Sequence, residues 1–110
     1  MKKDPTVWLE HVLESIEIID DHVADTTKVD FNSDVKLQDA VIRRLEIIGE
    51  ATKNIPERVK EEYPDVLWQK ITGMRDILAH EYFRVDTDVV LNTINDDLPE
   101  LKKQIEKALD

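Results

Sequence analysis

Cysteine is absent from the 110 residues of this chain. The protein therefore has no disulfide, no thiolate nucleophile and no thiolate ligand for a metal. A carboxylate-bridged pair of metal ions in a helical bundle needs Glu-x-x-His pairs, and none of the three histidines has a glutamate three positions before it. Glycine-rich phosphate-binding loops and the Gly-x-Ser-x-Gly turn of serine hydrolases are missing as well. We expect the protein to work without a metal ion or any other cofactor.

Glycine and proline are also scarce, with two and four copies, and no segment sustains the alternation of apolar and polar residues that is typical of a half-buried strand. Apolar residues instead recur three and four positions apart, as on one face of an α-helix. The length suits one hydrophobic core but not two ordinary domains of about 100 to 150 residues each. The sequence therefore predicts one all-α domain over residues 1–110, built as an up-and-down bundle of antiparallel helices.

Long apolar runs are missing too, because no stretch approaches the roughly 20 residues that cross a membrane. The opening Met1-Lys-Lys-Asp-Pro5 leads into a charged helix and not into an apolar signal segment. We expect a cytoplasmic protein that makes no use of a membrane.

The first helix is predicted to begin at Asp4, as the capping residue, with Pro5 in its first turn. Its inward stripe consists of Trp8, Val12, Ile16, Ile19 and Val23. The polar stretch over residues 25–34 is expected to be a loop.

The second helix is predicted to start at Ser33 or Asp34, either of which can cap it, and to run to about Lys53. Its apolar stripe consists of Leu37, Val41, Leu45, Ile48 and Thr52. Arg44 lies in the middle of this stripe, whereas Arg43 points roughly 100° away. A buried arginine needs partners, because an unpaired charge in a medium of low dielectric constant is costly. Arg44 is therefore either paired with a buried carboxylate or part of a functional surface.

The second half of the chain is expected to hold three helical pieces. A short charged piece lies between Pro56 and Pro64, and a second runs over about residues 65–79. The last is capped by Asp86 or Thr87, and we expect it to be bent near Pro99.

The segment Gly73-Met-Arg-Asp-Ile-Leu-Ala-His-Glu-Tyr82 has unusual helical geometry. Arg75 falls within about 20° of Trp68 and about 40° of Ala79, on the packed face, and Tyr82 continues that stripe. His80 is rotated from Arg75 by about 140° in a regular helix. The two side chains can therefore converge only if the helix loosens near Ala79, or if each meets a second copy of the chain across a dimer interface.

Each of these residues also has an ordinary structural interpretation. His80 can cap the C-terminal end of a helix, where the helix dipole favours a cation. Tyr82 can be a buried ring with a hydrogen-bonded hydroxyl, and Trp68 can be a core residue with no further role. His11 and His22 sit among carboxylates on the first helix and are interpreted as surface residues.

The formal net charge of −10 opposes nonspecific binding of nucleic acid, because contacts to phosphate dominate that affinity and need a basic surface. An RNA-binding function requires that the five arginines and some lysines gather in one place and leave the acidic residues on other faces.

The residues Arg75-Asp-Ile-Leu-Ala-His80-Glu-Tyr82 resemble the Arg-x4-His-x-Tyr motif of the HepT family of HEPN-domain toxins. The resemblance continues over nearly the whole chain, in the segments Asp4-Pro-x-x-Trp-Leu, Val41-Ile-Arg-Arg-Leu-Glu-Ile-Ile-Gly-Glu50, Trp68-x-x-Ile-x-Gly-Met-Arg75, Asp86 and Asp97-Leu-Pro99. It implies a HEPN bundle of four or five helices that forms a homodimer. In such a dimer the arginine and histidine of both copies line a cleft at the interface.

The resemblance also implies an activity: metal-independent endoribonuclease cleavage by the toxin half of a type VII-like toxin–antitoxin pair. His80 would be the general base or acid, because a histidine near its reference pKa of about 6.5 exchanges protons at neutral pH. Arg75 would stabilise the extra negative charge on the phosphate in the transition state. Asp76 would orient Arg75 or His80, and we add Arg44 as a residue that holds the RNA backbone.

Control of the toxin is implied as well. In the family, a partner nucleotidyltransferase of the MNT type attaches AMP groups to the tyrosine of the motif, which here is Tyr82. Such an adduct brings phosphate charge and bulk into the cleft and blocks RNA. Two other functions stay open on the residues alone: a non-catalytic helical module that presents nucleotide or substrate to a nucleotidyltransferase, and a purely structural dimerisation bundle, which leaves Arg44 and Arg75 unexplained.

Overall fold

The computed structural model describes residues 5–69, 71–73 and 87–109. Its helices are α1 (Pro5–Val23), α2 (Lys28–Ser33), α3 (Val35–Lys53), α4 (Glu57–Glu62), α6 (Thr87–Asn92), the π-helix η1 (Thr93–Asp97) and α7 (Leu98–Leu109). Residues 68–69 and 71–73 are also helical, and these described ranges contain no strand. The prediction of an all-α fold is confirmed.

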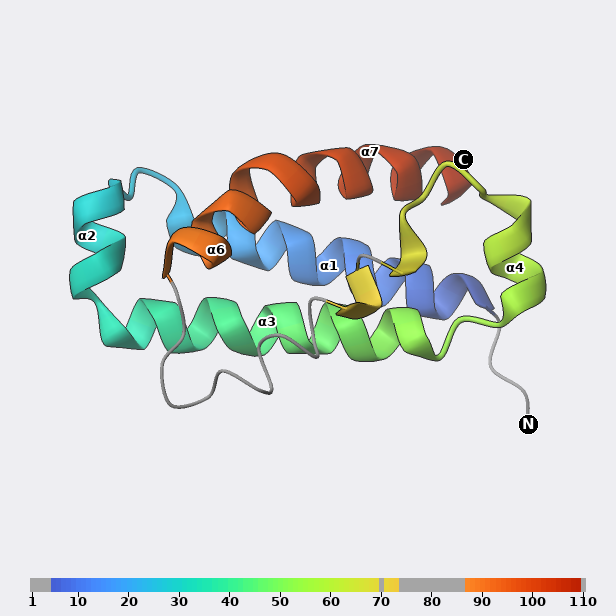
Figure 1. The fold of residues 1–110 in the computed structure, drawn as a ribbon, viewed down its shortest axis with the longest axis horizontal. Helices are drawn as coiled ribbons and strands as arrows, with labels where there is room; N and C mark the ends of the chain where they lie inside the picture. Colours follow the sequence, from blue (N-terminus) through green and yellow to red (C-terminus); the bar gives the residue numbers. More distant parts are fainter. Residues whose placement is uncertain (1–4, 70, 74–86, 110) are drawn as a thin grey trace.

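The two long helices α1 and α3 lie side by side, and α1 also packs against α7. Figure 1 shows α1 between the other two and antiparallel to both. The antiparallel arrangement expected from the helical spacing of apolar residues is therefore present among these three helices. In the described part of the chain, no helix combines the length and the apolar character needed to cross a bilayer.

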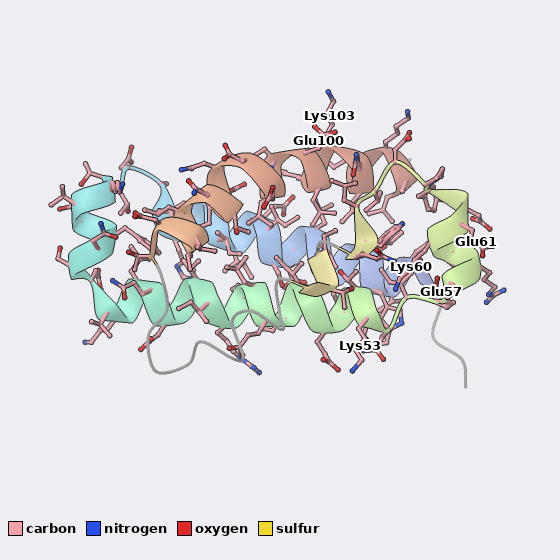
Figure 2. All side chains as sticks on the ribbon, in the orientation of Figure 1. Lys53, Glu57, Lys60, Glu61, Glu100 and Lys103 are labelled. Atoms are coloured by element: carbon pink, nitrogen blue, oxygen red, sulfur yellow. The ribbon has the colours of Figure 1, made fainter. Side chains whose placement is uncertain are left out.

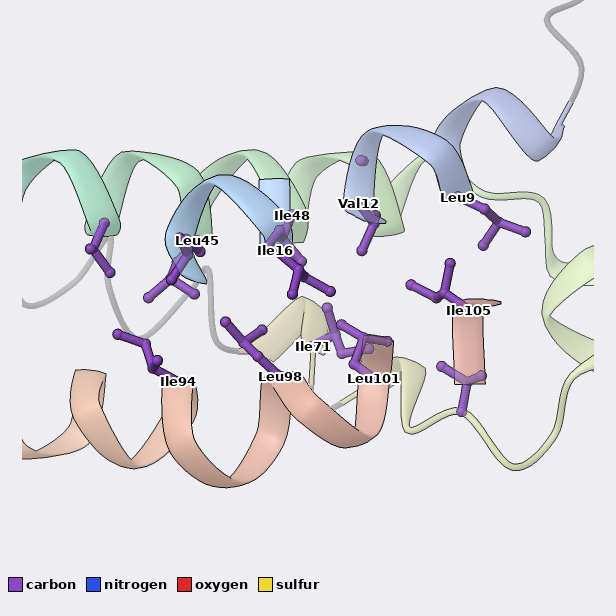
Figure 3. Close-up of a cluster of buried hydrophobic side chains, with 14 of the residues drawn as sticks. Leu9, Val12, Ile16, Leu45, Ile48, Ile71, Ile94, Leu98, Leu101 and Ile105 are labelled. Atoms are coloured by element: carbon purple, nitrogen blue, oxygen red, sulfur yellow. The ribbon is translucent and has the colours of Figure 1, made fainter. Parts of the chain in front are cut away.

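The core consists of the apolar faces that the three-and-four spacing predicts (Figure 3). On α1 and α3 the buried apolar residues are Leu9, Val12, Ile16, Ile19, Val41, Leu45, Ile48 and Ala51. On α6, η1 and α7 they are Val90, Ile94, Leu98, Leu101 and Ile105. Trp8, Val23 and Leu37, expected to point inward, are half-buried at the border of this core.

The N-terminal end of α3 is fixed by a side-chain cap, as the sequence predicts. The carboxylate Oδ1 of Asp34 accepts a hydrogen bond of 3.0 Å from the backbone N–H of Leu37. This satisfies one of the N–H groups that the first turn of a helix leaves without a partner.

The prediction of a loop over residues 25–34 is wrong for most of this stretch, because α2 occupies Lys28–Ser33. The hydroxyl of Thr27 caps α2 by accepting a hydrogen bond of 3.1 Å from the N–H of Asp30. Phe31 then buries its ring in the core at 1% exposure. A cap and one buried aromatic side chain are enough to hold a helix that has little apolar periodicity of its own.

The last helix is interrupted by the π-helix η1, which ends two residues before Pro99, in the region where a bend is expected. Pro99 has no N–H and its ring collides with the carbonyl four residues back in a regular helix. In η1 the N–H of Leu98 bonds the carbonyl of Thr93, five residues earlier. The wider turn lies immediately upstream of the proline, which is the second residue of α7.

The helix predicted from Asp65 begins later, because Asp65 and Val66 lie in a turn and Trp68 is the first helical residue. We call the described residues 67–69 and 71–73 the Trp68 segment. Its Ile71 is buried at 7% exposure and joins the core (Figure 3). The C-terminal end expected for this helix, near residue 79, lies outside the described residues.

Candidate functional site

Four of the predicted site residues, Arg75, Asp76, His80 and Tyr82, lie outside the described residues. Arg44, the fifth, is described. The structure describes Arg44 on α3 and the two flanks of the motif, which end at Gly73 and begin again at Thr87.

Arg44 is half-buried on α3, between the buried residues Val41 and Ile48 of the neighbouring turns. Its guanidinium makes no ion pair or hydrogen bond with the described part of the chain. Arg43, one position earlier, is 72% exposed and lies 3.6 Å from a carboxylate oxygen of Glu46. The two neighbouring arginines thus differ as the helical geometry predicts: Arg43 is a flank residue paired in solvent, and Arg44 is a recessed cation.

The gathering of arginines that RNA binding requires is visible only in part. Arg43 and Arg44 are neighbours on α3, and Arg58 is exposed on the short helix α4. Arg75 and Arg84 lie outside the described residues.

One flank of the motif borders a cavity with a volume of about 510 Å³. One wall comes from α4, with Glu57, Lys60 and Glu61. The opposite wall comes from the Trp68 segment, with Trp68, Gln69, Thr72 and Gly73. We call this space the Gly73 cavity; its volume is within the range of about 300 to 1,000 Å³ that is usual for small-molecule sites.

Hydrogen bonds from side chains to backbone carbonyls hold the Gly73 cavity and the turn before it in place. The indole Nε1–H of Trp68 lies 3.2 Å from the carbonyl oxygen of Lys60 and 3.1 Å from that of Tyr63, and donates to both. The side-chain amide of Gln104 on α7 donates a hydrogen bond of 2.8 Å to the carbonyl of Asp65. The turn that precedes the Trp68 segment is therefore tied to both α4 and α7.

Lys60 is placed unusually within this cavity. Its side chain is 13% exposed, and its ammonium lies 3.7 Å from a carboxylate oxygen of Glu57, whose side chain is 84% exposed. Figure 2 shows Lys60 on the side of α4 nearer the bundle. Because one partner is solvated and the distance is long, the ion pair holds Lys60 only weakly.

The other flank borders a second cavity of about 410 Å³ between the end of α1, α2 and α6. At its edge the ammonium of Lys28 lies 3.3 Å from the carboxylate of Asp88, and both side chains are largely exposed. Asn92 and Asn95 add amide groups to its wall. This exposed ion pair links α2 to α6 at the end of the bundle away from α4 (Figure 1).

The remaining histidines lie as the sequence predicts, on the surface of α1. His11 is exposed, with its ring edge-on to Trp8 at a centroid distance of 6.0 Å, and His22 is exposed near the C-terminal end of the helix. Within residues 5–69, 71–73 and 87–109, no three His, Asp or Glu side chains are grouped as a metal site requires.

Sequence reasoning missed the Gly73 cavity. Trp68 was interpreted only as a core residue, and Lys60 only as part of a charged helix. One signal was available: Gly73 stands in a helical segment, where glycine is unfavourable unless space or backbone geometry requires it. In the structure a Cβ atom added to Gly73 would meet nothing within 4 Å.

The chain is similar to several known proteins along its whole length. The family model described as "Ribonuclease HepT-like" matches residues 12–108. A protein of Thermococcus cleftensis named "Probable ribonuclease HepT" is 45% identical, with 97% of each chain covered. "Putative RNase" of Caldanaerobacter subterraneus subsp. tengcongensis is 43% identical, over 97% of this chain and 96% of that one.

A relative in Methanocaldococcus jannaschii, named "Gamma-glutamylcyclotransferase and putative RNase", is 46% identical over the whole of this chain. The chain spans half of that protein's length. No solved structure matches the chain. The family model and the identities of these relatives agree, and the chain belongs to the HepT-like ribonuclease family.

Proposed function

We propose that this chain is the RNA-cleaving toxin of a toxin–antitoxin pair, and that it acts as a metal-independent endoribonuclease. One observation carries the proposal: the HepT-like ribonuclease match over residues 12–108 includes the Arg75-x4-His80-x-Tyr82 motif. Relatives that carry ribonuclease in their names cover nearly the whole of this chain.

The proposed reaction uses the RNA itself as the nucleophile. His80 takes the proton from a ribose 2′-hydroxyl, whose oxygen attacks the adjacent phosphorus. The bond from phosphorus to the 5′ oxygen of the next nucleotide breaks, and a protonated histidine supplies the proton that this oxygen needs. The products are a 2′,3′-cyclic phosphate and a 5′-hydroxyl, so no water or metal-bound nucleophile enters the step.

The positive charge that this reaction requires is assigned to two arginines. Arg75 provides a guanidinium that stays charged at any working pH and stabilises the charge that grows on the phosphate oxygens. Asp76 orients Arg75 or His80. Arg44 is the described cation suited to the RNA backbone, because it is recessed on α3 and makes no ion pair with the described part of the chain.

A homodimer completes this proposal. Arg75 and His80 are separated by about 140° on a regular helix, so one copy does not readily aim both at one phosphate. Two copies that share a cleft supply one histidine as base and the other as acid. A cognate nucleotidyltransferase of the MNT type then controls the toxin by attaching AMP to Tyr82, two residues after His80, where the added phosphate repels RNA.

The test is cleavage of labelled RNA by the purified full chain in the presence of EDTA. We expect cleavage to persist, its products to carry cyclic phosphate and 5′-hydroxyl ends, and His80→Ala and Arg75→Ala to abolish it while circular dichroism and thermal unfolding stay unchanged. Full cleavage by His80→Ala would remove that residue from the mechanism. Loss of cleavage with EDTA and its return with Mg²⁺ would remove the metal-independent mechanism.

The net charge of −10 favours a second candidate: a non-catalytic module that presents nucleotide or substrate to a nucleotidyltransferase. For that function, the purified chain leaves RNA intact with and without divalent metal, yet binds the partner enzyme. Incubation with the partner, ATP and Mg²⁺, followed by intact mass and peptide mapping, tests the control mechanism, which fails if Tyr82 gains no AMP.

A further inference from the structure

The Gly73 cavity has an aromatic wall that is fixed in place. Both hydrogen bonds from the indole of Trp68 go to backbone carbonyls at the end of α4, so the polar edge of the ring is already satisfied. The ring is half-buried against the core, and its accessible part lines the cavity. A planar ligand can stack on such a ring without first ordering it, which lowers the entropic cost of binding.

The charges of the cavity disfavour a phosphate. Glu57 and Glu61 contribute two carboxylates and Lys60 one ammonium, and the ammonium is already beside Glu57. A phosphate placed here meets more negative than positive charge from the lining residues that the structure describes. Amino and ring N–H groups of a nucleobase, by contrast, donate hydrogen bonds that carboxylate oxygens accept.

Polar uncharged groups belong to the lining as well. Gln69 offers an amide, with both a donor and an acceptor, and Thr72 offers a hydroxyl. Gly73 keeps its side of the cavity open, because no atom lies within 4 Å of the position a Cβ would take. Stacking surface, hydrogen-bonding groups and carboxylates together suit the edge and face of a base and not a sugar phosphate.

The cavity is also close to the catalytic motif along the chain. Gly73 precedes Arg75 by two residues, and two residues of extended chain span at most about 7 Å. A base held at the Gly73 side of the cavity is therefore close, along the chain, to the residue that we assign to the phosphate. We propose that the Gly73 cavity is a subsite for one amino-bearing nucleobase of the RNA substrate, adjacent to the phosphodiester that is cut; this proposal rests on the ribonuclease function proposed above.

A binding experiment that does not depend on cleavage tests the subsite. In a Trp8→Phe background, Trp68 is the single tryptophan and its fluorescence reports stacking. We expect saturable quenching by adenosine, cytidine and guanosine, weaker quenching by uridine, which has no amino group, and none by ribose 5-phosphate. Equal quenching by ribose 5-phosphate, or none by any nucleoside, overturns the proposal.

A matched pair of variants tests the carboxylate. Glu61 lines the cavity, whereas Glu62 is exposed one position later on α4 and does not. Glu61→Gln and Glu62→Gln change the net charge equally. We expect Glu61→Gln to weaken nucleoside binding roughly tenfold, the usual effect of losing one hydrogen bond to a charged group, and Glu62→Gln to leave it unchanged. Equal effects of the two variants contradict a contact at Glu61.

Gly73→Leu closes the cavity without a clash at the Cβ position. We expect it to keep the thermal unfolding profile and to abolish quenching by all nucleosides; binding that survives in a folded variant counts against the site. If Gly73→Leu does not fold, the Glu61 and Glu62 pair still decides the question.

Cleavage of a random-sequence RNA pool separates the subsite from the ribonuclease function. We expect the bases flanking the cut to change with Glu61→Gln and not with Glu62→Gln. Active cleavage without nucleoside binding removes the subsite and leaves the ribonuclease intact. Nucleoside binding by a chain that cuts no RNA overturns the assignment of the bound base to an RNA substrate.

Discussion

The indole Nε1 of Trp68 lies 3.1 Å from the carbonyl oxygen of Tyr63 and joins the start of the Trp68 segment to the end of α4. Trp68→Phe keeps an aromatic ring but removes this bond and the companion bond to Lys60. We expect the free energy of unfolding to fall by about 1–2 kcal/mol, measured by urea denaturation and circular dichroism. Tyr63→Phe is the control: it removes only a 3.4 Å hydrogen bond to Ala108 and should cost less.

The cap of α3 gives a second stability prediction. Asp34→Ala removes the acceptor for the N–H of Leu37 and should lower the free energy of unfolding by about 0.5–2 kcal/mol. Asp34→Asn keeps an acceptor oxygen and should retain most of that stability. Asp39→Ala, an exposed position on the same helix, is the matched control, and an equal loss there argues against capping as the cause.

Two adjacent isoleucines on α3 test the depth of the core. Ile48 is fully buried, whereas Ile47 is half-buried. Ile48→Ala should cost about 2–5 kcal/mol, because it leaves a cavity between packed helices. Ile47→Ala, with the same change in composition, should cost clearly less. Equal costs in thermal or chemical unfolding contradict the packing described for α3.

The neighbouring arginines of α3 test where RNA is held. Arg44→Ala, in a His80→Ala background that prevents cleavage, should weaken binding of a short RNA roughly threefold to tenfold. It should also lower the slope of log affinity against log salt concentration by about one. Arg43→Ala should have a smaller effect, because Arg43 is already paired with Glu46. A larger loss with Arg43→Ala would move the RNA contact to the solvent-exposed face of the helix.

Local signals made α1, α3 and α4 predictable from the sequence. The cap of α3 joins Asp34 to a residue three positions later, and Pro56 stands immediately before α4, so nothing distant is needed to place these boundaries. The difference between Arg43 and Arg44 followed from helical angle alone. The Arg75-x4-His80-x-Tyr82 motif and the segments around it predicted the family to which the chain belongs.

Features that depend on tertiary contacts were not predictable. Helix α2 is held by the burial of Phe31 against elements that the surrounding polar residues do not reveal. The start of the Trp68 segment is set by a hydrogen bond from Trp68 to Lys60 on α4 and by one from Gln104 on α7 to Asp65, 39 positions earlier in the chain. The Gly73 cavity exists only because those contacts bring Lys60 opposite Gly73. The catalytic roles of Arg75 and His80 and the modification of Tyr82 stay predictions.

The π-helical turn at residues 93–97 makes the spacing between α6 and α7 sensitive to length. Val90, Ile94 and Leu98 are all buried although they are eight residues apart from first to last, and a regular helix turns twice in only about seven. The π-helical turn accommodates the one additional residue and keeps the three side chains on the buried face. Deleting one residue there, for example Asn95, would remove the surplus and let a regular helix keep Val90 and Leu98 on one face, whereas inserting one more residue would rotate α6 by about 100° relative to α7. After such an insertion Val90 would leave the core, and Thr87, the first described residue after the motif, would face another direction. An insertion at this turn should therefore be less tolerated than a deletion or a substitution.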